Sequence, residues 1–213
     1  MYHNEKYSGN YEMQQMKEPS MGYVRILHAV PDAPNVDIYA NDKIIARNLA
    51  FGQNTQYMTV PSGNYEISLY VAGTKDSPVL VNRLAVGNGS ITTVTAVGTL
   101  DTIGFLAIPD SNMTKESGKA MVRFSHLSPN APAVDITLPD GTILFRNVSY
   151  KQLAPYIPVP PMNYTLQVRA AGTPNVVLTV PNVNLEQNKM YTVYAIGLVG
   201  QDPELEALLL LDK

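Results

Sequence analysis

Two segments of this 213-residue chain carry nearly the same sequence. The first runs from Val24 to Ile38 and the second from Val122 to Ile136, so both of its ends are displaced by 98 residues. Each copy combines alternating apolar residues, a corner of the form Pro-x-Ala-Pro and a Val-Asp-Ile run. A repeat this long indicates two copies of one domain, because the units of solenoid proteins are several-fold shorter.

The correspondence continues beyond these segments after one inserted residue, which moves the offset to 99. It pairs residues 47–49 with 146–148, 57 with 156, 60–65 with 159–164, 72–74 with 171–173 and 94–98 with 193–197. Identity is highest at turns, where backbone geometry tolerates few residue types. Duplication followed by divergence leaves such a distribution.

The repeat therefore divides the chain into four segments. We predict a polar N-terminal extension at 1–21, a first repeat at 22–110, a polar linker at 111–119 and a second repeat at 120–213. Each repeat has about the length of one small domain and can bury a core of its own.

Apolar and polar residues alternate with period two inside both repeats, for example over 65–71 and 164–170. Proline and glycine fall mainly between such runs, and no segment shows sustained helical spacing. We predict an all-β chain of two tandem immunoglobulin-like antiparallel β-sandwich domains. Tyr65 and Tyr164 each open one of the alternating runs after a turn, which is typical of a tyrosine corner. Stacking on a ligand is the alternative role for these two rings.

The hallmark segment has the form His-x-(Ser/Val)-Pro-(Asp/Asn)-Ala-Pro-x-Val-Asp-Ile in both copies. It resembles the bacterial domain of unknown function family DUF4397, whose members carry this segment near the start of an Ig-like repeat, often in tandem. The resemblance covers both repeats and implies a secreted or surface-attached protein without an established reaction. Val30 and Asn130 depart from the usual Ser and Asp, which weakens an obligatory chemical role for either position.

Composition narrows the function further. A net charge of −3 and a pI near 5.6 argue against nucleic acid and anionic membranes as partners. The chain has no cysteine, and its longest apolar run, residues 207–211, is far shorter than the ~20 residues of a membrane span. Residues 1–21 lack the apolar core of a secretory signal. We expect retention in the cell, release by lysis, or removal of a signal before this sequence begins.

The best candidate for chemistry is a group of hallmark residues that occurs once in each repeat. Its members are His28, Asp32 and Asp37 in the first copy and His126, Asn130 and Asp135 in the second. Histidine and carboxylates near a turn can hold a metal or act as acid and base. Both histidines share the parity of the core residues, however, so we favour buried neutral imidazoles bonded to the Pro-x-Ala-Pro turn.

Asp37 and Asp135 fall on the opposite parity, where we expect them to pair with Arg25 and Arg123 of a neighbouring strand. We therefore expect no metal and no cofactor. The chain lacks a Gly-x-Ser-x-Gly nucleophile turn and any cysteine, which argues against an enzyme.

Two non-enzymatic functions remain. The first is a structural or assembly protein of a bacterial cell or spore surface, which binds itself or other surface proteins, does not bind nucleic acid and does not insert into a membrane. The alternative is a polysaccharide- or ligand-binding module. The chain has no Trp, and its outward tyrosines, such as Tyr39 and Tyr70, are scattered, so coplanar rings on one sheet face would be needed to favour it.

The N-terminal extension is the candidate for subunit contacts. It is polar, carries few charges and contains several large side chains, a composition that suits an adaptable strand or clamp. We expect it to engage another subunit through Tyr2, Tyr7, Tyr11, Met13 and Met16.

Overall fold

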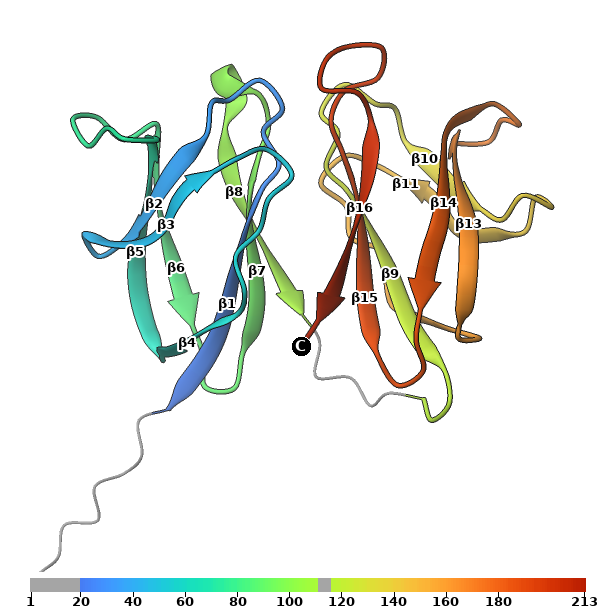
Figure 1. The fold of residues 1–213 in the computed structure, drawn as a ribbon, viewed down its shortest axis with the longest axis horizontal. Helices are drawn as coiled ribbons and strands as arrows, with labels where there is room; N and C mark the ends of the chain where they lie inside the picture. The colour runs from blue at the N-terminus through green and yellow to red at the C-terminus, as the bar shows by residue number, and fades with distance from the viewer. Residues whose placement is uncertain (1–19, 111–115) are drawn as a thin grey trace, which may run out of the picture.

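The computed structural model describes residues 20–110 and 116–213 of the chain. These residues form two β-sandwiches that stand side by side, one for each repeat (Figure 1). The all-β fold predicted from the alternating sequence is thus confirmed. The tail residues proposed for subunit contacts lie outside the described part of the chain.

Repeat 1 contains eight strands and one short 3-10 turn, η1 (Leu100–Thr102). Its inner sheet has the order β4-β1-β7-β8 and its outer sheet the order β3-β2-β5-β6. The strands are β1 (Met21–His28), β2 (Val36–Ala40), β3 (Lys43–Leu49), β4 (Met58–Pro61), β5 (Gly63–Val71), β6 (Leu80–Val86), β7 (Ile91–Val97) and β8 (Gly104–Asp110).

Repeat 2 reproduces this order strand by strand. Its inner sheet is β12-β9-β15-β16 and its outer sheet is β11-β10-β13-β14. The strands are β9 (Ala120–His126), β10 (Val134–Thr137), β11 (Ile143–Val148), β12 (Ile157–Val159), β13 (Met162–Ala170), β14 (Val176–Leu185), β15 (Met190–Ile196) and β16 (Glu206–Asp212).

One strand pair in each sandwich departs from the antiparallel pattern. β1 runs parallel to β7 and β9 runs parallel to β15, whereas the other strand pairs are antiparallel. The first strand of each repeat therefore lies in the middle of the inner sheet, between a short antiparallel neighbour and its parallel one. This position places the hallmark turn, which follows that strand, at one end of the sandwich.

The two inner sheets face each other, so the molecule has four layers in the order outer, inner, inner, outer (Figure 1). Every residue of β9 and of β15 is buried. Burial on both parities is typical of strands that are covered on both faces. A small apolar cluster lies between the inner sheets and combines Leu27, Ala29, Val97 and Ile108 of repeat 1 with Leu127, Tyr194, Ile196 and Leu210 of repeat 2.

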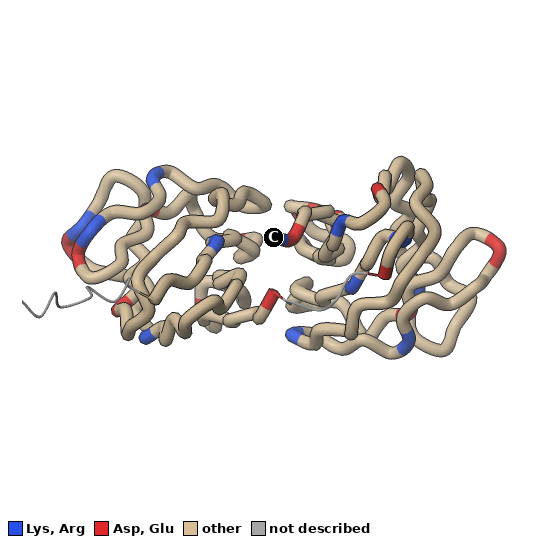
Figure 2. Tube along the Cα trace, turned by 90° about the horizontal axis from the view of Figure 1, so that it is seen from below, with Lys and Arg blue, Asp and Glu red and all other residues tan. Residues whose placement is uncertain are grey.

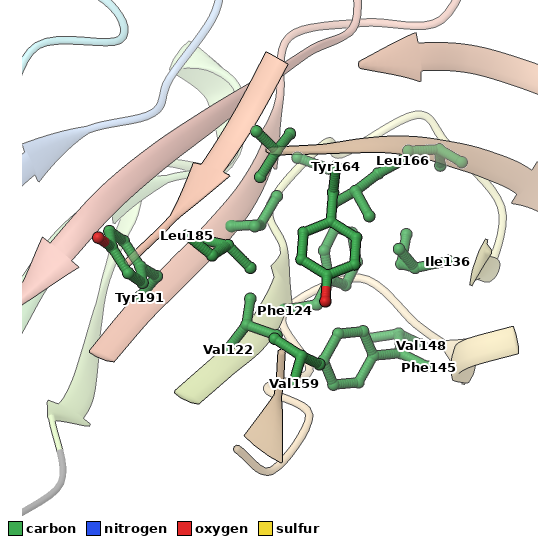
Figure 3. Close-up of a cluster of buried hydrophobic side chains, with 14 of the residues drawn as sticks. Val122, Phe124, Ile136, Phe145, Val148, Val159, Tyr164, Leu166, Leu185 and Tyr191 are labelled. Carbon is green, nitrogen blue, oxygen red and sulfur yellow. The ribbon is translucent and has the colours of Figure 1, made fainter. Parts of the chain in front are cut away.

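The core of each sandwich lies between its own inner and outer sheets. In repeat 2 the rings of Phe124 and Phe145 stack with their centroids 6.3 Å apart, close to the buried ring of Tyr164 (Figure 3). The corresponding positions of repeat 1 hold the smaller Ile26 and Ala46. Repeat 1 also has an apolar pocket of about 40 Å³, which other residues line, among them Ile45, Met58 and Tyr65.

Charged residues are sparse on both sandwiches and gather in no patch of one sign (Figure 2). The C-terminus lies at the junction of the two repeats. Among the residues described, no helix is long and apolar enough to cross a bilayer.

Candidate functional site: the hallmark turns and the buried interface

The histidine of each hallmark segment is fully buried and bonded to its own turn. Nε2 of His28 donates to the carbonyl of Pro34 at 3.3 Å, and Nδ1 accepts from the amide of Val30 at 3.3 Å. Nε2 of His126 donates to the carbonyl of Pro132 at 2.9 Å. Burial lowers the pKa of both imidazoles below the usual range, so both rings are neutral near pH 7.

The acidic or amide residue of each turn ties it to the loop after the parallel strand. Asp32 Oδ1 accepts from the amide of Leu100 at 2.9 Å, and Asn130 Oδ1 accepts from the amide of Val199 at 2.8 Å. Both side chains supply the same acceptor oxygen. Either Asp or Asn can therefore stand at this position, because each provides an oxygen that accepts from the backbone amide.

The aspartate of each Val-Asp-Ile run holds two backbone turns. Asp37 accepts from the amides of Asn48 (2.7 Å) and Gly73 (3.0 Å), both of which have positive φ. Asp135 accepts in the same way from Asn147 (2.7 Å) and Gly172 (3.0 Å). These bonds lower the pKa of the Asp37 carboxyl.

The expected pairing of Asp37 and Asp135 with Arg25 and Arg123 is therefore wrong. The aspartates lie in the outer sheets, whereas the arginines lie in the inner sheets with their side chains directed at the other repeat. The aspartates instead explain why the Arg-Asn and Ala-Gly-Thr matches occur in both copies: each run contains an amide that the carboxylate binds.

The two strand-initial tyrosines make the bond that defines a tyrosine corner. The hydroxyl of Tyr65 donates to the carbonyl of Pro61 at 2.7 Å, and that of Tyr164 donates to the carbonyl of Pro160 at 2.8 Å. The bond of Tyr65 is exposed to solvent, whereas Tyr164 is only 8% exposed. Both rings are thus tied to their own turns.

A buried polar network joins the inner sheets. The guanidinium of Arg25 bonds to Thr93 of its own repeat, and it reaches across to Asp212 Oδ1 at 2.7 Å and to the carbonyl of Leu211 at 2.8 Å. The Arg25 guanidinium lies 4.5 Å from the ring centroid of Tyr57. Arg25 is only 3% exposed.

Repeat 2 makes the reciprocal set of contacts. Arg123 bonds to Thr192 of its own repeat at 2.7 Å and reaches across to Asp110 and to the carbonyl of Pro109. Its guanidinium lies 4.4 Å from the ring centroid of Tyr156. The two repeats are thus related by an approximate two-fold arrangement of arginine and aspartate.

Each aspartate is also bonded within its own repeat. Asp110 Oδ2 accepts from Tyr57 (2.7 Å) and Thr93 (2.6 Å). Asp212 Oδ2 accepts from Tyr156 (2.7 Å) and Thr192 (2.5 Å). Two buried arginines and two buried aspartates therefore compensate one another, which is the condition under which such charges are tolerated between layers.

Burial dominates the electrostatics of this network. It raises the pKa of the Asp110 carboxyl, and the nearby Asp212 raises it further. Burial also raises the pKa of the Tyr194 hydroxyl to about 12. That hydroxyl, Thr95 Oγ1 and Ser125 Oγ have no hydrogen-bond partner among the described residues.

Sequence reasoning did not find this interface. The sequence analysis expects Arg25 and Arg123 to pair with outward-facing aspartates, but the face that the two arginines occupy is covered by the other repeat. A signal was available in β7 and β15, whose sequences ITTVTAV and MYTVYAI carry no charged residue on either parity. Asp110 and Asp212 lie at strand ends, and the residues near them in the sequence do not indicate that their partners are arginines of the other repeat.

The outward tyrosines of repeat 1 do meet on one sheet face. The rings of Tyr39 and Tyr70 lie 5.3 Å apart, but their planes are inclined by 76° in an edge-to-face contact. A sugar platform needs coplanar rings, and this pair does not provide them. Repeat 2 has Thr137 and Arg169 at the matching positions, joined by a hydrogen bond of 3.0 Å. Among the described residues, no group of three or more His, Cys, Asp or Glu could hold a metal ion.

The fold and the paired hallmark turns define a tandem β-sandwich protein in which the repeats are joined face to face. The family described as "Domain of unknown function (DUF4397)" matches residues 22–137 and 138–213, and the chain belongs to this family. The division between the two matched segments falls at the end of β10, inside the second sandwich.

Three solved structures show distant similarity. They are the C-terminal domain of AlgF from P. aeruginosa, the family CBM26 module CBMbc of Eubacterium rectale Amy13K in complex with maltoheptaose, and the Bacillus anthracis TIE protein. Their identities to this chain are 20%, 8% and 13%, with TM-scores of 0.35, 0.30 and 0.26. The alignments cover 44%, 91% and 87% of this chain and 98%, 97% and 34% of the respective structures. No curated protein gave a significant match.

Proposed function

We propose that this chain is a non-enzymatic building block of a bacterial cell or spore surface, which acts through contacts between subunits. The carrying observation is the interface, in which reciprocal ion pairs of Arg25 with Asp212 and of Arg123 with Asp110 join the repeats into one four-layered unit. Such a unit presents open sheet edges in fixed positions, as an assembling subunit requires.

The use of the polar hallmark residues supports this proposal. His28, Asp32 and Asp37 each bond to backbone atoms of their own repeat, as do their counterparts in repeat 2. A catalytic group must meet a substrate, but these side chains are engaged in fixing turns. The surface location is proposed on the family resemblance.

The N-terminal extension is proposed to make the subunit contacts. The strands of both described sandwiches lie between Met21 and Asp212, and the carbonyl of Ser20, just before the first strand, accepts from the amide of Ser62 at 2.7 Å. Deleting residues 1–20 is expected to leave the melting temperature nearly unchanged and to abolish higher-order assembly.

Sedimentation velocity of the full and truncated chains over a concentration series tests this proposal. A truncated chain that assembles as well as the full chain, or a full chain that stays monomeric at high concentration, would contradict it. Elemental analysis of the native protein supplies a second test, because stoichiometric metal would contradict a purely structural role for the hallmark residues.

A further inference from the structure

A pocket of about 420 Å³ lies on repeat 2 between strands β11 and β12. We call it the β11–β12 groove. Leu153 is 37% exposed in its wall. Its lining is mainly apolar and includes Leu144, Phe145, Leu153, Ala154, Pro155 and Ile157.

Both walls of this groove are edges of sheets. β11 is the end strand of the outer sheet, and β12 is the end strand of the inner sheet. The unpaired amide and carbonyl groups along an end strand can accept a further strand. A groove with an apolar floor between two such edges therefore fits an extended segment that has one apolar face.

The apolar lining distinguishes repeat 2 from repeat 1. Leu153, Ala154 and Pro155 occupy the positions of Asn54, Thr55 and Gln56 in repeat 1. The hydroxyl of Thr55 accepts from the amide of Ile26 at 3.0 Å, so this polar side chain serves its own repeat. Repeat 2 therefore has three apolar residues at this edge, where repeat 1 has three polar ones, and these apolar residues line a groove that can bind another segment.

The N-terminal extension contains a segment with the required pattern. Over residues 7–14, the apolar or small residues Tyr7, Gly9, Tyr11 and Met13 alternate with the polar residues Ser8, Asn10, Glu12 and Gln14. Such alternation gives an extended strand one apolar face.

Charge and length also agree with this occupant. The one charged residue of the segment is Glu12, and the one charged residue in the lining of the groove is Arg146. Residues 15–20 can span about 20 Å when extended, which separates the segment from the start of the first sandwich.

We propose that residues 7–14 of one copy add as a strand to the β11–β12 groove of a second copy. This inference rests on the proposed assembly function and names the surface that carries it. The donor segment precedes repeat 1 and the acceptor groove belongs to repeat 2, so the contact is heterologous and can continue from copy to copy. The product is a ring or an open chain of subunits, according to the rotation between successive copies.

Disulfide trapping tests the contact directly, because the native chain has no cysteine. Full-length Met13→Cys and Leu153→Cys chains are mixed and oxidised, and a disulfide-linked heterodimer is expected. Val81 of β6 is 46% exposed on repeat 1, and Met13→Cys mixed with Val81→Cys serves as the control that should remain unlinked. Absence of the heterodimer, or equal linkage in the control, overturns the proposal. Linkage within a single dilute chain of the Met13→Cys/Leu153→Cys double variant also overturns it, because the extension then occupies its own groove.

Substitution of the groove separates this proposal from the proposed function. Leu153→Asn introduces the residue that repeat 1 has at this position, so the melting temperature should not change. Loss of one buried leucine should weaken self-association by about tenfold or more, whereas Val81→Asn should not. If the deletion of residues 1–20 abolishes assembly and Leu153→Asn does not weaken it, the groove is not the binding site of the extension, but the proposed assembly function is still supported. If neither change affects assembly, both are wrong.

Discussion

Repeat 1 and repeat 2 share most of the polar and charged side chains that fix their turns and join their inner sheets, but they differ at several apolar positions of their cores. The matching side chains bind backbone atoms or opposite charges, as with Asp37 and Asp135, or Arg25 and Arg123. The differing side chains fill space, as Phe145 does where repeat 1 has Ala46. Loss of a carboxylate leaves backbone amides without their acceptor, whereas neighbouring apolar side chains can repack around an exchanged core residue.

The interface offers the largest test of this equivalence. Arg123→Met leaves the buried Asp110 without its ion-pair partner, which costs about 3–5 kcal/mol of unfolding free energy. Arg25→Met removes the 2.7 Å partner of Asp212 but leaves the Arg123 guanidinium 3.9 Å from the same carboxylate, so this variant should lose less, as measured by urea denaturation. Equal losses in the two variants would contradict this second contact of Arg123.

A matched double variant sharpens this result. Arg123→Met combined with Asp110→Leu removes both members of one pair, and it should recover part of the loss because no buried charge is left alone. A double variant that is less stable than Arg123→Met would contradict the assignment of the cost to the unpaired carboxylate.

The sequence predicted the elements of this structure better than their partners. Period-two alternation over 65–71 and 164–170 predicted strands, and the turn residues predicted where they end, since both signals act within a few residues. The burial of Arg25 and Arg123 was missed because parity assigns a residue to a face but does not say what covers that face. The parallel pairing of β1 with β7 was also missed, because strand order depends on contacts between distant parts of the chain.

The hallmark site was predicted in part for the same reason. The alternation of apolar residues predicted that both histidines are buried and bonded to their own turn. In the structure they bond to the carbonyls of Pro34 and Pro132, within the same segment. The partners of Asp37 lie 11 and 36 residues away, at Asn48 and Gly73, whose residue types indicate turns of positive φ but not which carboxylate binds their amides. Such contacts follow from the fold and are not encoded in the local pattern.

The second test concerns these aspartates. Asp37→Asn and Asp135→Asn replace a carboxylate that accepts two amide protons by a group with one acceptor oxygen. Each should cost about 1.5–3 kcal/mol, the value of hydrogen bonds to a charged group, measured as the shift in denaturant midpoint. Because the two carboxylates bind corresponding pairs of turns in their own repeats, the losses of unfolding free energy should be equal. Asp140→Asn, at an exposed turn, is the control and should change little.

The third test uses pH to compare the two histidines. Burial lowers the pKa of His28 and His126 in the folded state, so the unfolded chain binds more protons below its own pKa of about 6.5. Stability is therefore complete above that pH and falls as the pH decreases toward the folded pKa, by at most about 1.4 kcal/mol per pH unit for each histidine. Unfolding titrations between pH 7.5 and 5.5 measure this slope. His28→Gln and His126→Gln should each reduce it, and an unchanged slope in either variant would contradict the buried neutral assignment of that ring.

The smallest expected effect compares the two tyrosine corners. Tyr65→Phe and Tyr164→Phe each remove one hydroxyl and one hydrogen bond, to Pro61 and Pro160 respectively, at about 0.5–1.5 kcal/mol. The Pro61 carbonyl lies in an exposed contact where water can replace the hydroxyl, whereas the bond of Tyr164 is partly buried. Tyr164→Phe should therefore shift the denaturant midpoint more than Tyr65→Phe. Equal shifts would mean that water reaches both carbonyls. No shift in either variant would contradict the corner and favour ligand stacking as the role of the two rings.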